Sequence, residues 1–145
     1  MSLKLLFICT GNTCRSPMAE ELAREMFGEA VQVSSAGMGA WEGEKASAYA
    51  LAVLKEQNLD LSRHRSKKIS VDLLAEADWI IPMTQAQEES LRRLFPQFIH
   101  KTRYLGDWGE HKRDIRDPWS GSLEAYRQTA QEIGELLSVL KLYLN

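Results

Sequence analysis

A mostly apolar run near the start of the chain leads into a short polar loop and then into a proline. The run extends from Leu3 to Ile8, and the loop after it ends in Ser16-Pro17. A short apolar run bounded by turn residues is typical of a buried strand, and serine followed by proline is typical of the N-cap and first residue of a helix. The sequence therefore predicts a strand that passes through a tight loop into a helix.

The loop begins with a cysteine and has an arginine near its end. Five residues separate Cys9 from Arg15. At a helix N-terminus, free backbone N–H groups and the helix dipole attract an anion and favour an ionised thiol. Gly11 lets the backbone curl inward, and the planar guanidinium of Arg15 can hold two phosphate oxygens. This spacing indicates a phosphate site that contains a nucleophile.

Two structural explanations of the cysteines fit less well. Cys9 and Cys14 are the only cysteines, and the three histidines have no paired ligand spacing, which disfavours a zinc site. A permanent disulfide normally implies secretion, but the N-terminus has no signal-peptide pattern. We therefore expect a cytoplasmic protein without a metal.

The length and net charge of the chain limit the classes of protein to which it can belong. At 145 residues the chain is expected to form one domain, 1–145, and its formal charge of −2 leaves no broad basic face for nucleic acid. No apolar stretch approaches the roughly 20 residues that span a bilayer. The one basic run, Arg63 to Lys68, is predicted to be a solvated connection, with docking of a partner as the alternative. We expect a monomer with no nucleic-acid or membrane partner.

Strand and helix patterns alternate along the chain, which is typical of parallel strands joined by crossover helices. Strands are predicted at Leu3–Ile8, Val31–Ser35, Trp79–Met83 and, weakly, Thr102–Leu105. Helices are predicted at Pro17–Phe27, Glu44–Gln57 and Val71–Ala77, and another is predicted after a capping box formed by Thr84 and Gln87. The last predicted helix carries apolar or small residues at alternating spacings of four and three: Tyr126, Ala130, Ile133, Leu137, Leu140 and Leu144. The predicted class is α/β.

A polar loop from Gly106 to Gly121 is too long to be a simple connection. Open parallel sheets bind ligands beyond the carboxyl ends of their strands, so this loop can meet the cysteine loop there. Phosphoryl transfer to sulfur requires a proton for the departing atom, and Asp107, Asp114 and Asp117 are candidate donors. We favour Asp117, because the proline after it restricts its backbone and Trp119 can wall a pocket beside it. An ordinary Asp-Pro turn is the alternative for this loop taken alone.

Three motifs make the chain resemble the low-molecular-weight protein tyrosine phosphatases over essentially its whole length. They are Cys9-Thr10-Gly11-Asn12-Thr13-Cys14-Arg15-Ser16-Pro17, Ser35-Ala36-Gly37 and Asp117-Pro118-Trp119. The resemblance implies a three-layer α/β fold with a four-stranded parallel sheet flanked by helices, the flavodoxin-like phosphotyrosine phosphatase I fold. It also implies a phosphorylated protein as substrate, inorganic phosphate as product and no cofactor.

The resemblance also implies roles for individual residues. Cys9 would be the nucleophile, Arg15 the phosphate clamp and Asp117 the general acid. The phosphate would be bound by Thr10, Gly11, Asn12, Thr13, Cys14, Arg15 and Ser16, and the loop would be shaped by hydrogen bonds among Asn12, Ser16 and Ser35. Trp41 and Trp119 would wall the substrate pocket, although Trp41 could instead be an isolated surface aromatic.

Thr13 leaves open which phosphorylated residue is the substrate. The position before the second cysteine is commonly isoleucine in the tyrosine phosphatases, whereas threonine there resembles the bacterial protein-arginine phosphatases. Trp41 and Trp119 favour a planar phenyl ring, but a guanidinium also stacks on aromatic rings. Phosphotyrosine is the main prediction and phosphoarginine the alternative.

The sequence disfavours two other activities and indicates one redox property. Arsenate reductases use this kind of loop, but that chemistry needs resolving thiols beyond it, and the chain has none after Cys14. A catalytically inactive phosphoprotein-binding module is disfavoured because Cys9, Arg15 and Asp117 are all present. Since Cys9 and Cys14 lie on one tight loop, we expect peroxide to join them in a reversible disulfide, with Cys14 as the redox partner.

Overall fold

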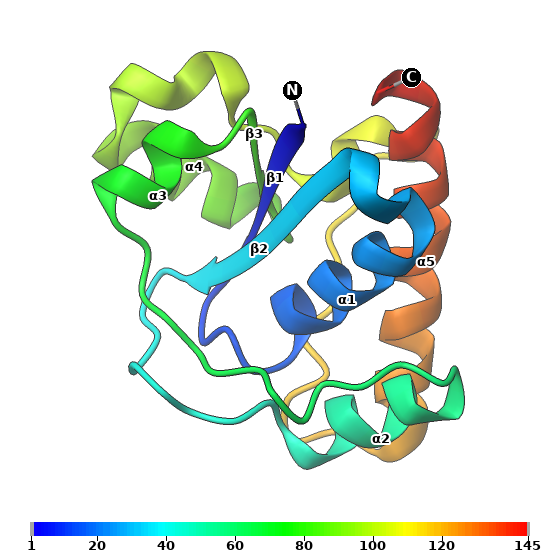
Figure 1. Cartoon of the computed structure of the whole chain (residues 1–145). Helices are drawn as coiled ribbons and strands as arrows, with labels where there is room; N and C mark the ends of the chain where they lie inside the picture. Colours follow the sequence, from blue (N-terminus) through cyan, green and yellow to red (C-terminus); the bar gives the residue numbers. More distant parts are fainter. Residues whose placement is uncertain (1, 145) are drawn as a thin grey trace.

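A parallel sheet forms the centre of the fold in the computed structural model, which describes residues 2–144 (Figure 1). Its strands are β1 (Leu3–Cys9), β2 (Val31–Gly37) and β3 (Trp79–Pro82), in the spatial order β2-β1-β3. Cys9 pairs with Gly37 at the last position of the β1–β2 ladder. The carboxyl ends of the strands therefore meet at one edge, where β1 delivers Cys9.

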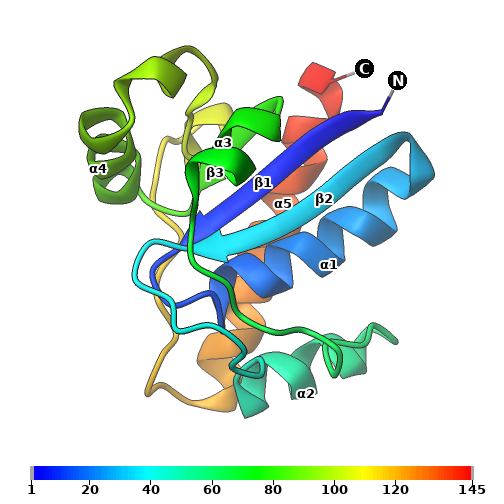
Figure 2. The same cartoon turned by 60° about the vertical axis from the view of Figure 1, so that its left-hand side comes forward.

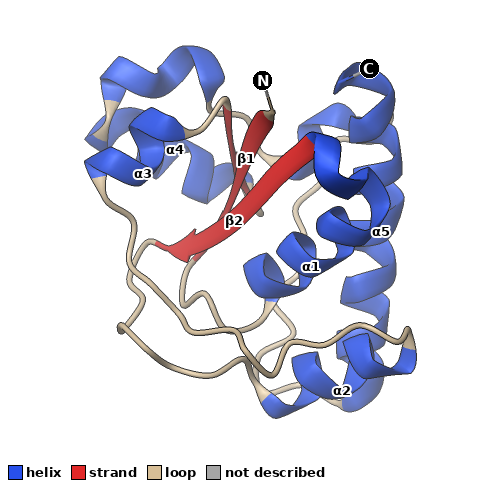
Figure 3. Ribbon diagram, in the orientation of Figure 1, coloured by secondary structure: helices blue, strands red, loops and turns tan. Residues whose placement is uncertain are grey.

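Helices cover both faces of this sheet, giving three layers (Figures 1 and 3). One face carries α1 (Arg15–Phe27) and α5 (Leu123–Leu144), against which α2 (Ala48–Glu56) packs. The view in Figure 2 shows α3 (Val71–Glu76) and α4 (Gln85–Leu94) on the other side. The class and the alternation predicted from the sequence are confirmed.

The central strand β1 is apolar on both faces because each face meets a separate core. Leu5 and Phe7 pack into the cluster with α1, α2 and α5, whereas Leu6 and Ile8 pack into the cluster with α3 and α4. All four side chains are buried. Successive side chains of a strand point to opposite faces, so a strand covered on both sides reads as a continuous apolar run.

The predicted fourth strand, Thr102–Leu105, is reduced to a single bridge between Ile80 and Thr102. The backbone N–H of Tyr104 donates to the Glu88 carboxylate at 2.8 Å instead of to a neighbouring strand. Leu105 then begins a short 3-10 helix, Leu105–Trp108, which takes the first part of the predicted long loop. The count of four strands is therefore not confirmed.

Two helices begin differently from the prediction. Helix α1 starts at Arg15 rather than Pro17, and its N-cap is Cys14, so Ser16 is not a cap. Helix α2 starts at Ala48 rather than Glu44, because the side chain of Ser47 caps it by accepting from Ala50 N at 3.3 Å. The capping box of α4, by contrast, is present as predicted.

Two further 3-10 segments, Gly28–Ala30 and Pro96–Lys101, complete the regular structure. Among residues 2–144, none of the helices has both the length and the apolar character required to cross a membrane.

Candidate active site

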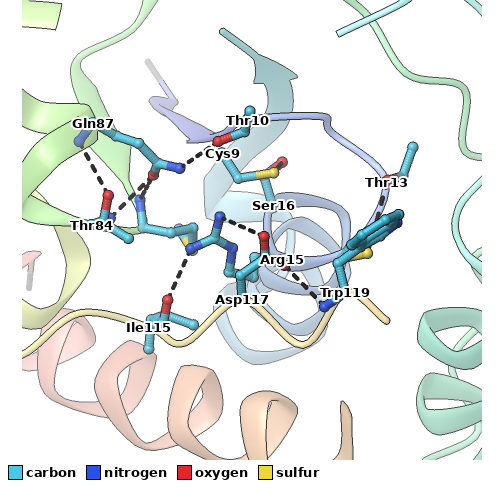
Figure 4. Close-up of polar contacts among 12 residues, drawn as sticks. Cys9, Thr10, Thr13, Arg15, Ser16, Thr84, Gln87, Ile115, Asp117 and Trp119 are labelled. Atoms are coloured by element: carbon cyan, nitrogen blue, oxygen red, sulfur yellow. Dashed lines mark hydrogen bonds and ion pairs between the residues drawn. The ribbon is translucent and has the colours of Figure 1, made fainter. Parts of the chain in front are cut away.

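The loop after β1 surrounds the sulfur of Cys9 with hydrogen-bond donors (Figure 4). The hydroxyl of Ser16 lies 2.9 Å from Cys9 Sγ, and the backbone N–H of Asn12 donates to the same sulfur at 3.3 Å. The backbone N–H groups of Gly11, Thr13 and Cys14 find no acceptor within residues 2–144. These free donors, together with the first turn of α1, form a concave site suited to a tetrahedral anion.

Asn12 holds the loop in its unusual shape. Its φ of 57° lies in the left-handed region, which asparagine tolerates better than most residues. Its Nδ2 donates to Ser16 Oγ at 2.8 Å and to Ser35 Oγ at 2.9 Å. Ser35 in turn donates to Glu20 at 2.6 Å. The predicted network of Asn12, Ser16 and Ser35 is thus formed by direct contacts, and it leaves the proton of Ser16 free to point at the Cys9 sulfur.

Two residues of the basic run complete this network, and neither was predicted from the sequence. The backbone N–H of Lys67 donates to Asn12 Oδ1 at 3.0 Å, which fixes the orientation of the Asn12 amide. His64 Nε2 lies 2.7 Å from the carbonyl oxygen of Asn12. The sequence offered no signal for either contact, because each joins residues more than 50 positions apart and Lys67 contributes only its backbone N–H. The run is therefore more than a solvated connection.

Gly37 explains why the Ser35-Ala36-Gly37 motif ends in glycine. A Cβ at this position would lie 2.7 Å from the carbonyl oxygen of Thr10 and 3.0 Å from the backbone nitrogen of Asn12. Only a residue without a side chain lets the end of β2 lie so close to the loop.

Arg15 connects the cysteine loop to the long loop. Its guanidinium is nearly buried, with a side-chain exposure of 7%, and Nη1 donates to the carbonyl oxygen of Ile115 at 2.9 Å. Nη2 lies 3.7 Å from Asp117 Oδ2, and Asp117 Oδ1 accepts from Trp119 N at 3.0 Å. The Asp117 side chain is 55% exposed, so its carboxylate stands at the mouth of the site and faces the arginine.

The other two candidate acids lie in different surroundings. Asp114 Oδ1 accepts from the backbone N–H of Gln85 at 2.7 Å, at the first residue of α4. Asp107 pairs with Arg103 at 2.7 Å and with Lys112 at 3.2 Å. Although burial alone would raise it, these contacts hold the pKa of Asp107 below its ordinary value, so Asp107 is a poor proton donor. The structure brings only Asp117 to Arg15.

The start of α4 anchors both the cysteine loop and the long loop. Ile115 N donates to the carbonyl oxygen of Met83 at 3.0 Å, immediately before α4. Within α4, the side-chain amide of Gln87 donates to the hydroxyl of Thr10, on the cysteine loop, at 3.1 Å. The cysteine loop and the long loop are thus both attached to the start of α4.

A pocket of about 210 Å³ opens above the cysteine. Its lining is Cys9, Thr10, Gly11, Thr13, Cys14, Arg15, Asp117 and Trp119. The side chain of Trp119 is 70% exposed and stands on the rim, whereas Trp41 is 78% exposed and is not among the lining residues. Trp119 is in the position expected of a wall, and a wall role for Trp41 stays a prediction.

Cys14 is held beneath the loop by two hydroxyl groups. Its Sγ lies 3.5 Å from Ser47 Oγ and 3.3 Å from Tyr126 OH, and both cysteines are free thiols. Burial, together with the hydrogen bond to Cys14, raises the pKa of Tyr126 to about 12. The phenol therefore stays protonated and can keep donating to the sulfur. Cys14 lines the same pocket as Cys9.

We predict that peroxide inactivates the protein reversibly by forming a disulfide between Cys9 and Cys14. Sulfenic acid on Cys9 would be attacked by the Cys14 thiolate before further oxidation occurs. Mass spectrometry of the oxidised protein, before and after a thiol reductant, measures the outcome. Cys14→Ser should instead accumulate sulfinic acid on Cys9, and finding sulfinic acid in the wild type beside a free Cys14 thiol would contradict the prediction.

Within residues 2–144, no three histidine, cysteine or acidic side chains gather in a group that could hold a metal ion. The groups assembled at this site are a thiol, a guanidinium, a carboxylate and backbone donors, all of which can act directly on a phosphoryl group.

Comparison with known proteins identifies the family of the chain. The family model for low molecular weight phosphotyrosine protein phosphatases matches residues 4–145. The chain belongs to this family. It is therefore a phosphatase, and the resemblance noted from the three motifs is confirmed.

Relatives with two different substrates match at similar levels. The protein-arginine-phosphatase of Geobacillus stearothermophilus is 37% identical over 141 residues, covering 97% of this chain and 95% of that protein. The low molecular weight protein-tyrosine-phosphatase Wzb of Salmonella typhi is 36% identical over 123 residues, covering 85% and 81%. Among solved structures, a cysteine-to-serine mutant of the YwlE arginine phosphatase with a phosphorylated active-site serine superimposes with a TM-score of 0.92, at 35% identity and coverages of 98% and 95%.

Proposed function

We propose that this phosphatase hydrolyses phosphotyrosine in protein substrates through a phosphocysteine intermediate. The observation that carries the proposal is the juxtaposition of Cys9, Arg15 and Asp117 around one pocket, which is also lined by loop residues whose backbone N–H groups have no acceptor among residues 2–144. The phosphorylated active-site serine in the YwlE mutant supports a covalent phosphoenzyme in this family.

In the first step, the Cys9 thiolate attacks phosphorus and the bond from phosphorus to the leaving oxygen breaks. The backbone donors and Arg15 balance the charge on the equatorial oxygens. Because Arg15 Nη1 is already fixed on the Ile115 carbonyl, the rest of its guanidinium is oriented before substrate arrives. Asp117, at the mouth of the pocket, protonates the leaving oxygen.

In the second step, water attacks the phosphocysteine and the sulfur–phosphorus bond breaks. Asp117, now a carboxylate, accepts the proton of this water, and inorganic phosphate leaves. Ser16 and the Asn12 backbone N–H stabilise the departing thiolate of Cys9, since both lie within hydrogen-bond distance of its sulfur. The reaction requires no metal and no organic cofactor.

A second candidate substrate, phosphoarginine, is favoured by one specific observation. Thr13 lines the pocket with a small polar side chain, and a relative that matches at 37% identity is a protein-arginine-phosphatase. Phosphoarginine brings a branched, planar guanidinium close to phosphorus, where a bulkier residue would crowd it.

We predict that the wild type hydrolyses phosphoarginine as well as phosphotyrosine, and that Thr13→Ile shifts the preference toward phosphotyrosine. The expected shift is roughly 1 to 3 kcal/mol, the scale of small steric changes in a pocket. Matched peptides that differ only in the phosphorylated residue provide the test, with kcat/KM measured on both proteins from the release of inorganic phosphate.

Thr13→Ser is the matched control, because it keeps the hydroxyl without adding bulk and should leave the ratio close to that of the wild type. If the wild type ignores phosphoarginine and Thr13→Ile does not change the ratio, the protein is a tyrosine phosphatase and Thr13 is incidental. Absence of hydrolysis of both peptides would overturn the proposed function itself.

We further propose that the protein acts in the cytoplasm as a monomer. The reaction consumes a phosphorylated protein and needs a reduced Cys9, and reducing compartments keep cysteines in that state. Both thiols are free in the structure, which is the form that the mechanism uses.

A further inference from the structure

We propose that the side-chain hydroxyl of Thr10 donates a hydrogen bond to the phosphoryl group of the substrate, and that Gln87 of α4 positions it for this task. The proposal deepens the proposed function, on which it rests, by adding a substrate contact from a side chain rather than from the loop backbone. It also gives a role to a residue that local sequence patterns identify only as part of a helix cap.

The orientation of the Gln87 amide is fixed. Its Oε1 accepts from the backbone N–H groups of Met83 at 3.0 Å and Thr84 at 3.2 Å. A glutamine oxygen accepts and its nitrogen donates, so this arrangement turns Nε2 away from the helix start. Nε2 then donates to Thr10 Oγ1 at 3.1 Å. Gln87 is buried, so water competes little for this hydrogen bond.

This contact determines what the Thr10 hydroxyl can do. Because its oxygen accepts from Gln87, its own proton is not needed for that contact, and within residues 2–144 it meets no other partner. A hydroxyl that accepts one hydrogen bond becomes a better donor in the next, since hydrogen bonds in a chain polarise one another. Thr10 is exposed, and it lines the pocket beside Cys9.

The expected acceptor follows from the chemistry of the pocket. Any substrate of this site must place its phosphoryl oxygens above Cys9, next to Thr10, and these oxygens carry negative charge. Figure 4 shows Gln87 and Thr10 on the side of Cys9 that is opposite to Trp119, so the substrate would enter between them and the tryptophan. Thr10 would thus complete the ring of donors on the side that faces α4.

The first test measures binding of inorganic phosphate by calorimetry, which does not depend on turnover. We expect Thr10→Val to weaken binding by roughly 5- to 30-fold, the range for a hydrogen bond to a charged group at a partly exposed site. Thr10→Ser keeps the hydroxyl and should bind within about twofold of the wild type. Equal binding by the valine and wild-type proteins would overturn the proposal.

A double-mutant cycle tests the role of Gln87. Gln87→Met removes the donor and should weaken phosphate binding by roughly 3- to 10-fold when Thr10 is present, but by less than about twofold in the Thr10→Val background. Loss of the α4 cap lowers stability in both backgrounds alike, so a purely structural role would weaken binding equally in both and would contradict the proposal. Gln85→Met is the matched control, since its exposed side chain lies two positions away on the same helix.

A second variant covers the case in which the methionine protein does not fold. Gln87→Glu keeps an oxygen acceptor for the two backbone N–H groups. Its carboxylate, however, would accept the hydrogen bond of the Thr10 hydroxyl, which would then no longer be available to the phosphoryl group. Its effect on phosphate binding should again be larger with Thr10 than with valine, and equal effects would overturn the assignment.

Kinetics separate this proposal from the proposed function. Because the phosphoryl group is common to all substrates, Thr10→Val should lower kcat/KM by a similar factor for phosphotyrosine, phosphoarginine and small aryl phosphates. A loss confined to one substrate, with unchanged phosphate binding, would show that Thr10 contacts the leaving group instead. A wild type that binds phosphate through Thr10 yet hydrolyses nothing would overturn the proposed function and leave this contact standing.

Discussion

Replacing Cys9 with serine should remove essentially all phosphatase activity, by roughly 10⁴-fold or more. A thiolate is a far stronger nucleophile than an alcohol, and hydrogen-bond donors around a sulfur stabilise the thiolate form. The sulfur of Cys9 already has two such donors, the Ser16 hydroxyl and the Asn12 backbone N–H. Initial rates on an aryl phosphate and on a phosphotyrosine peptide measure the effect.

Cys14→Ser is the matched control, because it makes the same chemical change on the same loop without touching the nucleophile. It should retain most of the turnover in reducing buffer. Binding of inorganic phosphate should survive in Cys9→Ser, which shows that the loop is intact. Substantial turnover by Cys9→Ser would assign the attacking group to another residue.

Replacing Asp117 with asparagine should produce the second largest effect, and its size should depend on the leaving group. For a poor leaving group such as phosphotyrosine, the loss of a proton donor is expected to cost roughly 10²- to 10⁴-fold in kcat. For an activated aryl phosphate the loss should be much smaller, because that leaving group departs without a proton. The slope of log kcat against leaving-group pKa, measured over a series of aryl phosphates, is the quantity to compare.

Asp114→Asn provides the control for this second variant. The Asp114 carboxylate accepts from the start of α4, so its loss perturbs the loop without removing a proton donor. We expect a modest effect that is the same for all leaving groups. If Asp117→Asn lowers the rate equally on every leaving group, the carboxylate only supports Arg15, and the general acid has to be sought elsewhere.

Most of the fold could be predicted because its signals are local. Strand β1 is an apolar run because both of its faces are buried, and the capping box at Thr84 and Gln87 can be recognised within four residues. The start of α2 was misjudged because Glu44 and Ala46 are compatible with a helix. In the fold, Glu44 O accepts from Ser66 N at 2.7 Å and Ser47 N donates to Thr13 O at 2.9 Å. Contacts with distant segments thus override the local preference for helix.

In the candidate site, too, features with a local sequence signal could be predicted, whereas contacts between distant segments could not. The placement of Cys9 and Arg15 on one loop could be predicted from their spacing, and of Asp114 and Asp117 only Asp117 faces the arginine. The catalytic roles of these residues stay predictions. His64 and Lys67 could not be predicted, because their contacts with Asn12 depend on how two distant segments pack together. The hydrogen bond from the Gln87 side chain to Thr10 was hidden for the same reason.

The start of α4 is a common attachment point for the loop that carries Cys9 and the loop that carries Asp117. The nucleophile loop reaches it through the Gln87 side chain, and the loop of the acid reaches it through Asp114 and Ile115. A small shift of this helix would carry both loops in the same direction, so the gap between sulfur and carboxylate would change less than the position of either. These three hydrogen bonds at the start of α4 thus help to set the position of the two loops relative to each other. Substitutions in the outer helices and at the far ends of the strands would then leave the relative position of the two loops unchanged.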